Sequence, residues 1–459
     1  MRLFLYTVAA FCLVKSYSQN KPNVIIIITD DQGYQDLGCY GSPLIKTPAI
    51  DKMAKEGLRL TSYYVSSSVS SASRAGLMTG KFNNKNGITG VLWPGDEGLS
   101  TDEKTIAEYL KEAGYKTACF GKWHLGDAEG HLPINQGFDI YYGIPYSNDM
   151  YIGPTQKIDK NIKLREGFTI RKIKEAQNFV KSHNRQEISK KGLIGLSPLM
   201  SQNKVIEFPC DQSTLTHRYF DRAIDFISDI KGYPFFIYLT PNMPHIPLYA
   251  SDQFKGTSKR GLYGDVIEEI DWNVGRLLSY LEENNLSENT IIVYTSDNGP
   301  WLEHKENGGS ALPLKDGKFS HYEGGVRVPC IIKWKNHIPQ NITSEAIMVN
   351  VDWLPTILHY AGIETINKDI DGVDYSAFLS NPEINIRDEY PYIKNGAIHG
   401  IRKNNWIYLP KTGAKKTPAN PKPELFNIQK DINEKYNLYE QNPQVVEEMK
   451  RLIKKYVFQ

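Results

Sequence analysis

Residues 23–33 read Asn-Val-Ile-Ile-Ile-Ile-Thr-Asp-Asp-Gln-Gly, an apolar run that ends on two acidic side chains. The run does not alternate polar and apolar residues, so it predicts a strand that is covered on both faces. Shorter runs of the same kind lie at 117–120, 235–239 and 291–294. Helical patterns lie between these runs, at 49–56, 103–113, 216–230 and 263–283. Alternating strands and helices predict an α/β fold with a large, mostly parallel sheet sandwiched by helices.

The last part of the chain has a different pattern. Residues 406–408 predict a strand of a small sheet, and residues 443–456 predict a helix with apolar side chains on one side. We therefore expect a large domain over residues 19–385 and a smaller C-terminal α+β domain over residues 386–459.

Residues 1–18 have the pattern of a secretory signal peptide. Arg2 precedes an apolar run over residues 3–14, and small and polar residues follow it up to Ser18. The run is too short to span a bilayer, and no other stretch is long and apolar enough to do so. We expect cleavage near Ser18, a periplasmic or secreted mature protein, and no membrane span.

The composition is that of a globular protein with a large core, with 40% hydrophobic residues in 459. Removing Arg2 and Lys15 with the leader reduces 54 Lys and Arg residues to 52, which equals the number of Asp and Glu residues. Global charge therefore favours no class of partner, and we expect no nucleic-acid partner. The four remaining cysteines lack metal-binding spacing and leave two alternatives open, free thiols or one or two disulfides: Cys39, Cys119, Cys210 and Cys330.

Polar side chains follow the four predicted strands, and groups beyond the carboxyl ends of parallel strands meet in one crevice. Asp30 and Asp31 follow the first strand, and Asp297 and Asn298 follow another. Such hard oxygen donors without a thiolate suit Ca²⁺ or Mg²⁺ better than Zn²⁺, and several carboxylates favour Ca²⁺. A single acidic pair is more often a solvated loop or a helix cap. The shared position after buried strands favours a metal site.

The stretch Ser70-Ser71-Ala72-Ser73-Arg74 precedes Ala75-Gly76-Leu77-Met78-Thr79-Gly80. Taken alone, it also fits a Ser-rich loop that caps a helix. It resembles the sulfatase signature, in which a Cys or Ser is oxidised to formylglycine (3-oxoalanine). The chain is similar to type I sulfatases of the alkaline-phosphatase-like superfamily, and within them to the arylsulfatase A and N-acetylgalactosamine-6-sulfatase group. Matching segments run almost end to end: 23–41, 47–51, 70–81, 120–126, 142–149, 241–247, 295–300, 314–329, 352–362 and 425–438.

The resemblance implies a calcium ion and a modified nucleophile. Asp30, Asp31, Asp297 and Asn298 would hold one Ca²⁺ per chain, and formylglycine made from Ser70 would complete its shell. The ion would hold one sulfate oxygen and act as a Lewis acid. Of the two hydroxyls of hydrated formylglycine, one would attack sulfur and the other would drive the release of sulfate.

The resemblance also assigns roles to charged side chains around the sulfate. Arg74, one helical turn after Ser70, would neutralise charge on the hydrate. Lys122 and Lys318 would grip the sulfate. His124 would orient the hydrate, and His245 would protonate the leaving oxygen as general acid.

Three further features carry weaker signals. Ser147 resembles a sulfate-contacting serine, although a hydroxyl in this loop also fits turn chemistry. Residues 157–191 are rich in Lys and Arg and fit either a groove for a sulfated polymer or a solvated face. Trp301, Glu303 and His304 fit either a sugar subsite or ordinary loop packing.

One position departs from the family pattern, because Ala72 stands where most members have Pro. The pair of Ser70 and Ala72 is compatible with a bacterial, serine-type sulfatase-maturating enzyme that uses radical chemistry. We expect a sulfatase that hydrolyses sulfate esters of a sulfated saccharide, such as oligosaccharides from a polysaccharide. The alternatives are a phosphatase or phosphodiesterase of the same superfamily that uses Ser70 directly, and a non-catalytic sulfated-glycan binding protein.

Overall fold

The computed structural model describes residues 21–364, 369–416 and 418–457. The predicted signal peptide, residues 1–18, lies outside the described residues. Within the described part of the chain, no helix is long and apolar enough to cross a bilayer. All four cysteines after the leader are free thiols, so of the two alternatives the structure shows the unpaired one.

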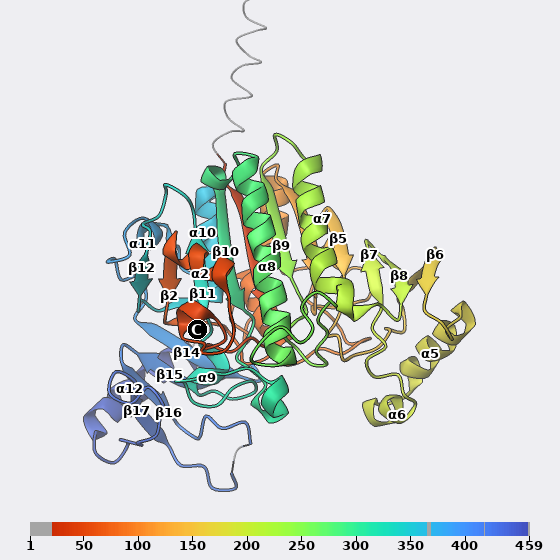
Figure 1. Cartoon of the computed structure of the whole chain (residues 1–459). Coiled ribbons are helices and arrows are strands. Elements are labelled where there is room, and N and C mark those ends of the chain that lie inside the picture. Colours follow the sequence, from red (N-terminus) through yellow and green to blue (C-terminus); the bar gives the residue numbers. More distant parts are fainter. Residues whose placement is uncertain (1–20, 365–368, 417, 458–459) are drawn as a thin grey trace, which may run out of the picture.

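An eleven-stranded sheet forms the centre of the molecule, in the order β12-β2-β11-β10-β1-β9-β4-β5-β7-β8-β6 (Figure 1). Its central strands, from β10 to β5, are parallel, and antiparallel strands are added on both sides. The predicted α/β fold is thereby confirmed. The strands are β1 Asn23–Thr29, β2 Leu58–Leu60, β4 Lys116–Gly121, β5 Ile140–Gly143, β6 Lys157–Leu164, β7 Leu199–Ser201, β8 Lys204–Phe208, β9 Phe235–Thr240, β10 Thr290–Ser296, β11 Cys330–Lys333 and β12 Ile342–Ser344.

Helices cover both faces of this sheet. Ile25 and Ile27 of β1 pack in one core cluster with α2, α7 and α8, whereas Val24, Ile26 and Ile28 pack in another with α3, α4 and α10. This explains why β1 has no polar alternation, since both of its faces are buried. The helices are α2 Pro48–Lys55, α3 Ser70–Thr79, α4 Ile106–Glu112, α5 Ile170–Ser182, α6 Arg185–Lys190, α7 Leu215–Asp229, α8 Leu262–Glu283, α9 Glu323–Val326, α10 Trp353–Tyr360, α11 Ser376–Ser380 and α12 Pro443–Val457.

Short elements complete the main body. They are the paired strands β3 Tyr63–Tyr64 and β13 Met348–Val349, and the 3₁₀ helices η1 Gly38–Tyr40, η2 Pro133–Asn135, η3 Gln212–Thr214, η4 Ser287–Asn289, η5 Leu302–Asn307 and η6 Asn350–Asp352. The helix expected over 103–113 begins later, at Ile106. Thr105 and Glu108 form a capping box at its start, which fixes this boundary.

A separate antiparallel sheet lies toward the C-terminus and consists of β14 Glu389–Lys394, β15 Ala397–Lys403, β16 Trp406–Leu409 and β17 Glu424–Asn427. Helix α12 packs on it through Val446 and Met449, which contact the cluster around Ile401. In Figure 1 this blue unit stands at the lower left, and α5 and α6 project at the lower right. The arrowhead of β9 points to the same lower side, so the carboxyl ends of the parallel strands lie on that side.

Candidate active site

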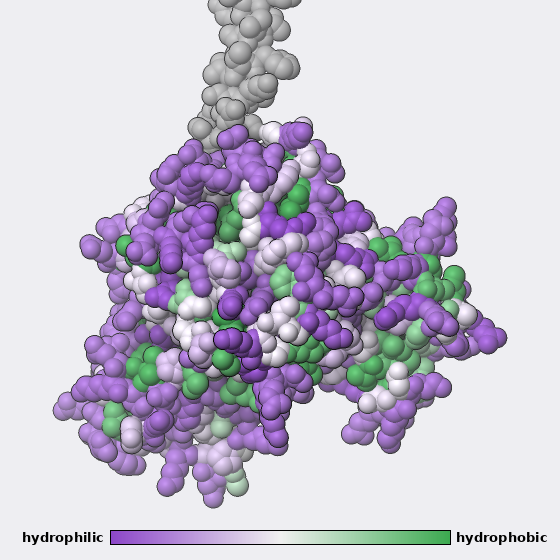
Figure 2. Space-filling view, viewed as in Figure 1, coloured by the Kyte–Doolittle hydropathy of each residue, from purple (hydrophilic) through white to green (hydrophobic). Residues whose placement is uncertain are grey.

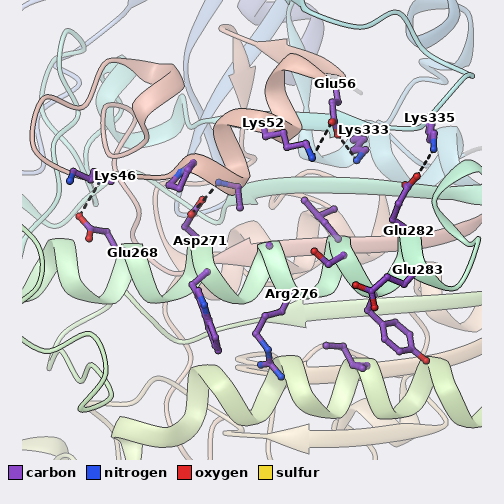
Figure 3. Close-up of a pocket in the computed structure, with 18 of the residues that line it drawn as sticks. Lys46, Lys52, Glu56, Glu268, Asp271, Arg276, Glu282, Glu283, Lys333 and Lys335 are labelled. Carbon is purple, nitrogen blue, oxygen red and sulfur yellow. Dashed lines mark hydrogen bonds and ion pairs between the residues drawn. The ribbon is translucent and has the colours of Figure 1, made fainter.

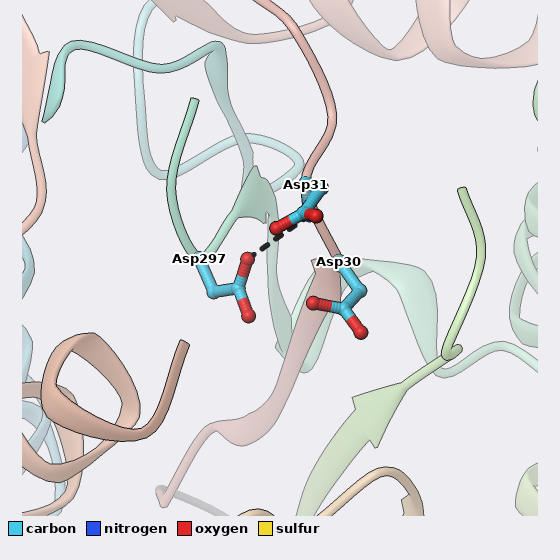
Figure 4. Close-up of side chains that lie close together, drawn as sticks. All are labelled: Asp30, Asp31 and Asp297. Carbon is cyan, nitrogen blue, oxygen red and sulfur yellow. Dashed lines mark hydrogen bonds between the residues drawn. The ribbon is translucent and has the colours of Figure 1, made fainter. Parts of the chain in front are cut away.

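The acidic side chains of the site follow two adjacent strands. Strands β1 and β10 are parallel and in register, with Thr29 opposite Ser296. The next residues on each strand, Asp30 and Asp297, are therefore neighbours. Asp30, Asp31 and Asp297 are buried and offer carboxylate oxygens that all lie within 4.8 Å of one another (Figure 4).

Ser70 stands at the start of α3 and points at this cluster. Its Oγ lies 3.0 Å from Oδ1 of Asp30 and 3.2 Å from Oδ1 of Asn298. The alternative of a capping serine is wrong, because Val69 is the N-cap residue and makes no side-chain cap. Ser70 is only 1% exposed. The helix thus directs this side chain at the carboxylates.

Each carboxylate of the cluster is paired with a different cation. Asp30 lies 2.6 Å from Nζ of Lys122, Asp31 lies 2.7 Å from Nζ of Lys318, and Asp297 lies 2.9 Å from Nε of Arg74. Three buried negative charges therefore face three buried positive charges, which compensates much of their desolvation. These six side chains come from parts of the chain up to 288 residues apart.

The two lysines differ in their electrostatic surroundings. Burial lowers the pKa of Lys122, and Asp30 only partly opposes this effect. Burial also lowers the pKa of Lys318, but Asp31 and Asp30 outweigh it, so the net shift is upward. Nζ of Lys122 also lies 3.4 Å from Oγ of Ser70 and 3.3 Å from Oγ of Ser147. The ammonium group of Lys122 therefore bridges the nucleophile position and the predicted substrate-contacting serine.

His245 is fixed by acceptors on one ring nitrogen. Nδ1 lies 2.6 Å from the carbonyl oxygen of Ile246 and 3.1 Å from Oδ1 of Asn148, which places the proton on Nδ1. Nε2 then faces Asp31, 3.6 Å from its carboxylate. Asn148 was not predicted as a site residue, although it lies next to Ser147 in one of the matching segments.

His124 has the opposite arrangement. Its Nε2 lies 3.0 Å from the carbonyl oxygen of Leu92, so Nε2 carries the proton and Nδ1 is an acceptor. Among the described residues, Nδ1 is buried without a hydrogen-bond partner. Burial, with Lys122 and Arg74 nearby, holds the pKa of His124 well below 6.5, which keeps the ring neutral.

The donor set fits a hard divalent cation. The carboxylates of Asp30, Asp31 and Asp297 lie together, and Oγ of Ser70 contacts Asp30 and the amide oxygen of Asn298, without a thiolate or imidazole in the cluster. Such all-oxygen sets are typical of Ca²⁺. These four side chains and the group at residue 70 could hold the ion.

The rim carries aromatic side chains from the segment after Asn298. Trp301 lies 5.7 Å from the ring of His245 and 4.6 Å from Nζ of Lys318. His304 packs edge-on against Trp301 at 4.5 Å. Glu303 instead pairs with Lys415, at 2.6 Å, on a loop of the C-terminal sheet. Trp301 therefore lies closest to the site of the three predicted subsite residues.

A groove with a volume of about 1250 Å³ lies between α2 and α8 (Figure 3). Its charged side chains neutralise one another, as in the contacts of Glu56 with Lys52 and Lys333, 3.6 and 2.7 Å long. Neither Ser70 nor any of the acidic residues Asp30, Asp31 and Asp297 lines it. The reactive groups are therefore gathered at the strand ends and not in this groove.

The chain matches known protein families over almost its whole length. The family model described as Sulfatase matches residues 22–363, and the model described as N-sulphoglucosamine sulphohydrolase, C-terminal, matches residues 315–459. Human arylsulfatase A is 34% identical over 462 residues, which cover 94% of this chain and 87% of that protein. N-acetylgalactosamine-6-sulfatase of Rattus norvegicus is 34% identical over 392 residues, which cover 81% of this chain and 68% of that protein.

Solved structures extend the comparison to the fold. The crystal structure of Ps i-CgsB in complex with k-i-k-neocarrahexaose has a TM-score of 0.77 and 31% identity, and the match covers 95% of this chain and 92% of that one. PsFucS1 sulfatase from Pseudoalteromonas sp. has a TM-score of 0.81 and 27% identity, and the match covers 98% of this chain and 92% of that one. The chain therefore belongs to the sulfatase family and is a sulfuric ester hydrolase.

Proposed function

We propose that this enzyme hydrolyses sulfate esters of a sulfated saccharide, with formylglycine made from Ser70 and a bound calcium ion. The observation that carries this proposal is the position of Ser70. Its Oγ lies among Asp30, Asn298 and the ammonium group of Lys122, at 3.0, 3.2 and 3.4 Å. An oxygen on the Cβ carbon of residue 70 is therefore adjacent both to the oxygen donors and to a sulfate-binding cation.

The charged side chains bind and orient the sulfate group. Lys122 and Lys318 are buried and held on Asp30 and Asp31, so their ammonium groups meet the developing charge without reorganisation. Arg74 is fixed by Asp297 and by the carbonyl oxygen of Lys122, and it stabilises negative charge near residue 70.

The two histidines have separate roles, His124 in orienting residue 70 and His245 in proton donation. Neutral His124 accepts a hydrogen bond at Nδ1 from a hydroxyl on residue 70, because its other nitrogen already donates to Leu92. His245 is oriented through Nδ1–H, and in its imidazolium form, with both ring nitrogens protonated, it donates the Nε2 proton to the leaving oxygen of the alcohol. Ser147, whose Oγ is 3.3 Å from Nδ1 of His245, contacts a sulfate oxygen.

The calcium ion, when bound by Asp30, Asp31, Asp297 and Asn298, supplies a Lewis acid for a sulfate oxygen. Formylglycine supplies a hydrated aldehyde, whose second hydroxyl permits release of sulfate from residue 70. A plain serine has no second hydroxyl, which is why the modification is part of the proposal.

A saccharide substrate is supported by the rim and by the relatives. Trp301 presents an indole ring beside His245 and Lys318, where an apolar face of a sugar can pack. The Ps i-CgsB structure, 31% identical to this chain, is described as a complex with k-i-k-neocarrahexaose. We place the mature enzyme in the periplasm or outside the cell, after removal of residues 1–18, and assign its maturation to a serine-type sulfatase-maturating enzyme.

The test is the mass of the peptide that contains Ser70, from protein co-expressed with a serine-type maturating enzyme. Formylglycine lacks two hydrogens relative to serine, and the turnover of an aryl sulfate should rise in proportion to the converted fraction. Protein made without the maturating enzyme and the Ser70→Ala variant should both be inactive. Full activity with unmodified Ser70 would contradict the proposed mechanism.

A further inference from the structure

Positive charge is concentrated in one segment of the chain. Residues 157–191 contain eleven Lys and Arg residues against four Asp and Glu residues, a net charge of +7. The whole chain has a net charge of only +2, so the remaining residues sum to −5. We call this segment, which comprises β6, α5 and α6, the basic arm. It forms a distinct lobe at the lower right of Figure 2.

The basic arm is attached to the loop that carries Ser147. Nε2 of Gln177, on α5, donates to the carbonyl oxygens of Gly153 and Gln156, at 3.0 and 2.9 Å. After α6, the backbone N–H of Gly195 donates to the carbonyl oxygen of Asp149 at 3.0 Å. The arm is therefore anchored within a few residues of the site.

A pocket of about 770 Å³ opens between the basic arm and the body. Its walls come from residues 93–96, 151–155 and 180–188. The guanidinium group of Arg185 lies 4.2 Å above the ring of Trp93, and Tyr151 stacks with the same ring at 6.4 Å. The pocket therefore combines an aromatic wall with the cation of Arg185, whose side chain is 55% exposed.

The pocket has an excess of positive charge. Lys181, His183 and Arg185 line it, and Asp96 is the acidic residue among its lining side chains. Asp96 lies 3.6 Å from Arg185. Within the described parts of the chain, Lys181 makes no ion pair, and it is exposed. The charge of Lys181 is thus not balanced within the pocket, in contrast to the charges of the groove between α2 and α8.

The same backbone segment joins this pocket to the catalytic side chains. The carbonyl oxygen of Leu92 binds Nε2 of His124 at 3.0 Å, and the N–H of Leu92 donates to Oγ of Ser71 at 3.0 Å. Trp93, the next residue, is a wall of the pocket. On the other wall, Tyr151 follows Ser147 by four residues, a span of at most about 14 Å.

We propose that this pocket binds a second, sulfated unit of the saccharide chain while the attacked sulfate lies at Lys122 and Lys318. The inference rests on the proposed function and adds that the substrate is an oligomer with more than one sulfate. The guanidinium group of Arg185 can hold a sulfate through two parallel hydrogen bonds, and Lys181 adds a second charge. The net charge of the basic arm raises the local concentration of such a polyanion.

The experiment compares two pairs of substitutions that remove equal charge from the arm. The first is Lys181→Gln with Arg185→Gln, both inside the pocket. The matched control is Arg171→Gln with Lys174→Gln, both exposed on α5 but outside the pocket. Steady-state kinetics use 4-nitrocatechol sulfate and disaccharides and hexasaccharides of carrageenan and chondroitin sulfate. Calorimetry on the Ser70→Ala background measures binding of the same saccharides.

We expect the wild-type enzyme to prefer the hexasaccharide of its substrate series, and the pocket variant to lose about tenfold in hexasaccharide kcat/KM through KM. Turnover of 4-nitrocatechol sulfate should be unchanged in both variants, and the control pair should keep the hexasaccharide preference. Equal losses in both pairs, or no hexasaccharide preference in kinetics and binding, would overturn the proposal. Absence of sulfate release from every substrate, aryl sulfate and saccharides alike, in matured wild-type enzyme would instead contradict the proposed function.

Discussion

His245 shows how a single side chain is prepared for proton transfer. Its Nδ1 is held by the carbonyl oxygen of Ile246 and by Asn148, which leaves Nε2 directed into the site. His304, on the same rim, contacts Trp301 edge-on and does not share these partners. The two histidines therefore form a natural pair for testing the general acid.

We predict that His245→Ala lowers kcat/KM for a sulfated sugar by about 10²–10⁴-fold, because the alkoxide would leave without a proton. For 4-nitrophenyl sulfate the loss should be much smaller, since the phenolate is a stable leaving group. His304→Ala should not change the ratio of the kcat/KM values for the two substrates. Equal losses for sugar and aryl sulfates in His245→Ala would contradict the assigned role. The measurement is steady-state kinetics on matured protein.

At the scale of the element, α3 positions both Ser70 and Arg74. The helix packs closely on the segment after β3, and a Cβ at Gly76 would meet Oγ of Ser66 at 2.1 Å. Asn350 also holds this packing, because its amide donates to the carbonyl oxygen of Ser73 and its Oδ1 accepts from the N–H of Ser66. Gly76 therefore permits a close approach of α3 to Ser66, and this contact fixes the position of the helix.

We predict that Gly76→Ala destabilises the protein by about 1–3 kcal/mol through overpacking, although alanine is the better helix former by about 1 kcal/mol. Aryl sulfate turnover should fall as well, because Ser70 and Arg74 move with the helix. The free energy of unfolding is measured by urea denaturation. The double variant with Ser66→Gly should regain part of the loss, and strict additivity of the two changes would contradict the steric explanation.

At the scale of the whole molecule, buried carboxylates join the C-terminal sheet to the main body. Glu323 accepts hydrogen bonds from Tyr64 of β3 and Tyr392 of β14, both 2.6 Å long, and pairs with Arg327 at 3.0 Å. Glu434, which is fully buried, accepts from the N–H of Glu323 at 2.9 Å. Burial and the charge of Glu323 hold the pKa of Glu434 well above its usual value.

This shift predicts a pH-dependent stability. The folded state binds the proton of Glu434 more tightly than the unfolded state, so this group's contribution is fully present below about pH 4.3 and is lost as the pH rises through the folded pKa. Glu434→Gln, which stays neutral, should therefore gain stability relative to wild type as the pH rises from 5 to 8. Urea unfolding at several pH values measures the difference.

The control for this prediction is Glu440→Gln, which changes an exposed glutamate of the same segment. The difference in the free energy of unfolding between this variant and the wild type should not vary with pH. A constant difference for Glu434→Gln as well would mean that Glu434 is ionised in the folded protein throughout this range.

The sequence could predict what depends on local patterns. The apolar run before Asp30 predicted a strand buried on both faces, and the helical periodicity predicted α2, α7 and α8 to within a residue or so. Residue types after the strands predicted an oxygen-rich site because parallel strands bring their carboxyl ends together. The start of α4 was misplaced, because its capping box was not taken into account.

Only the tertiary structure decided how those groups are paired. The contacts of Asp30 with Lys122, Asp31 with Lys318 and Asp297 with Arg74 join distant parts of the chain, and no local pattern specifies the partner. The same holds for the free cysteines and for the pocket at Trp93 and Arg185. The sequence by itself determined the strand before Asp30, the helices α2, α7 and α8, and the chemical types of the side chains at the site. Packing of the sheet determined which charges meet, because side-chain contacts across the fold depend on the register and stacking of elements far apart in the chain.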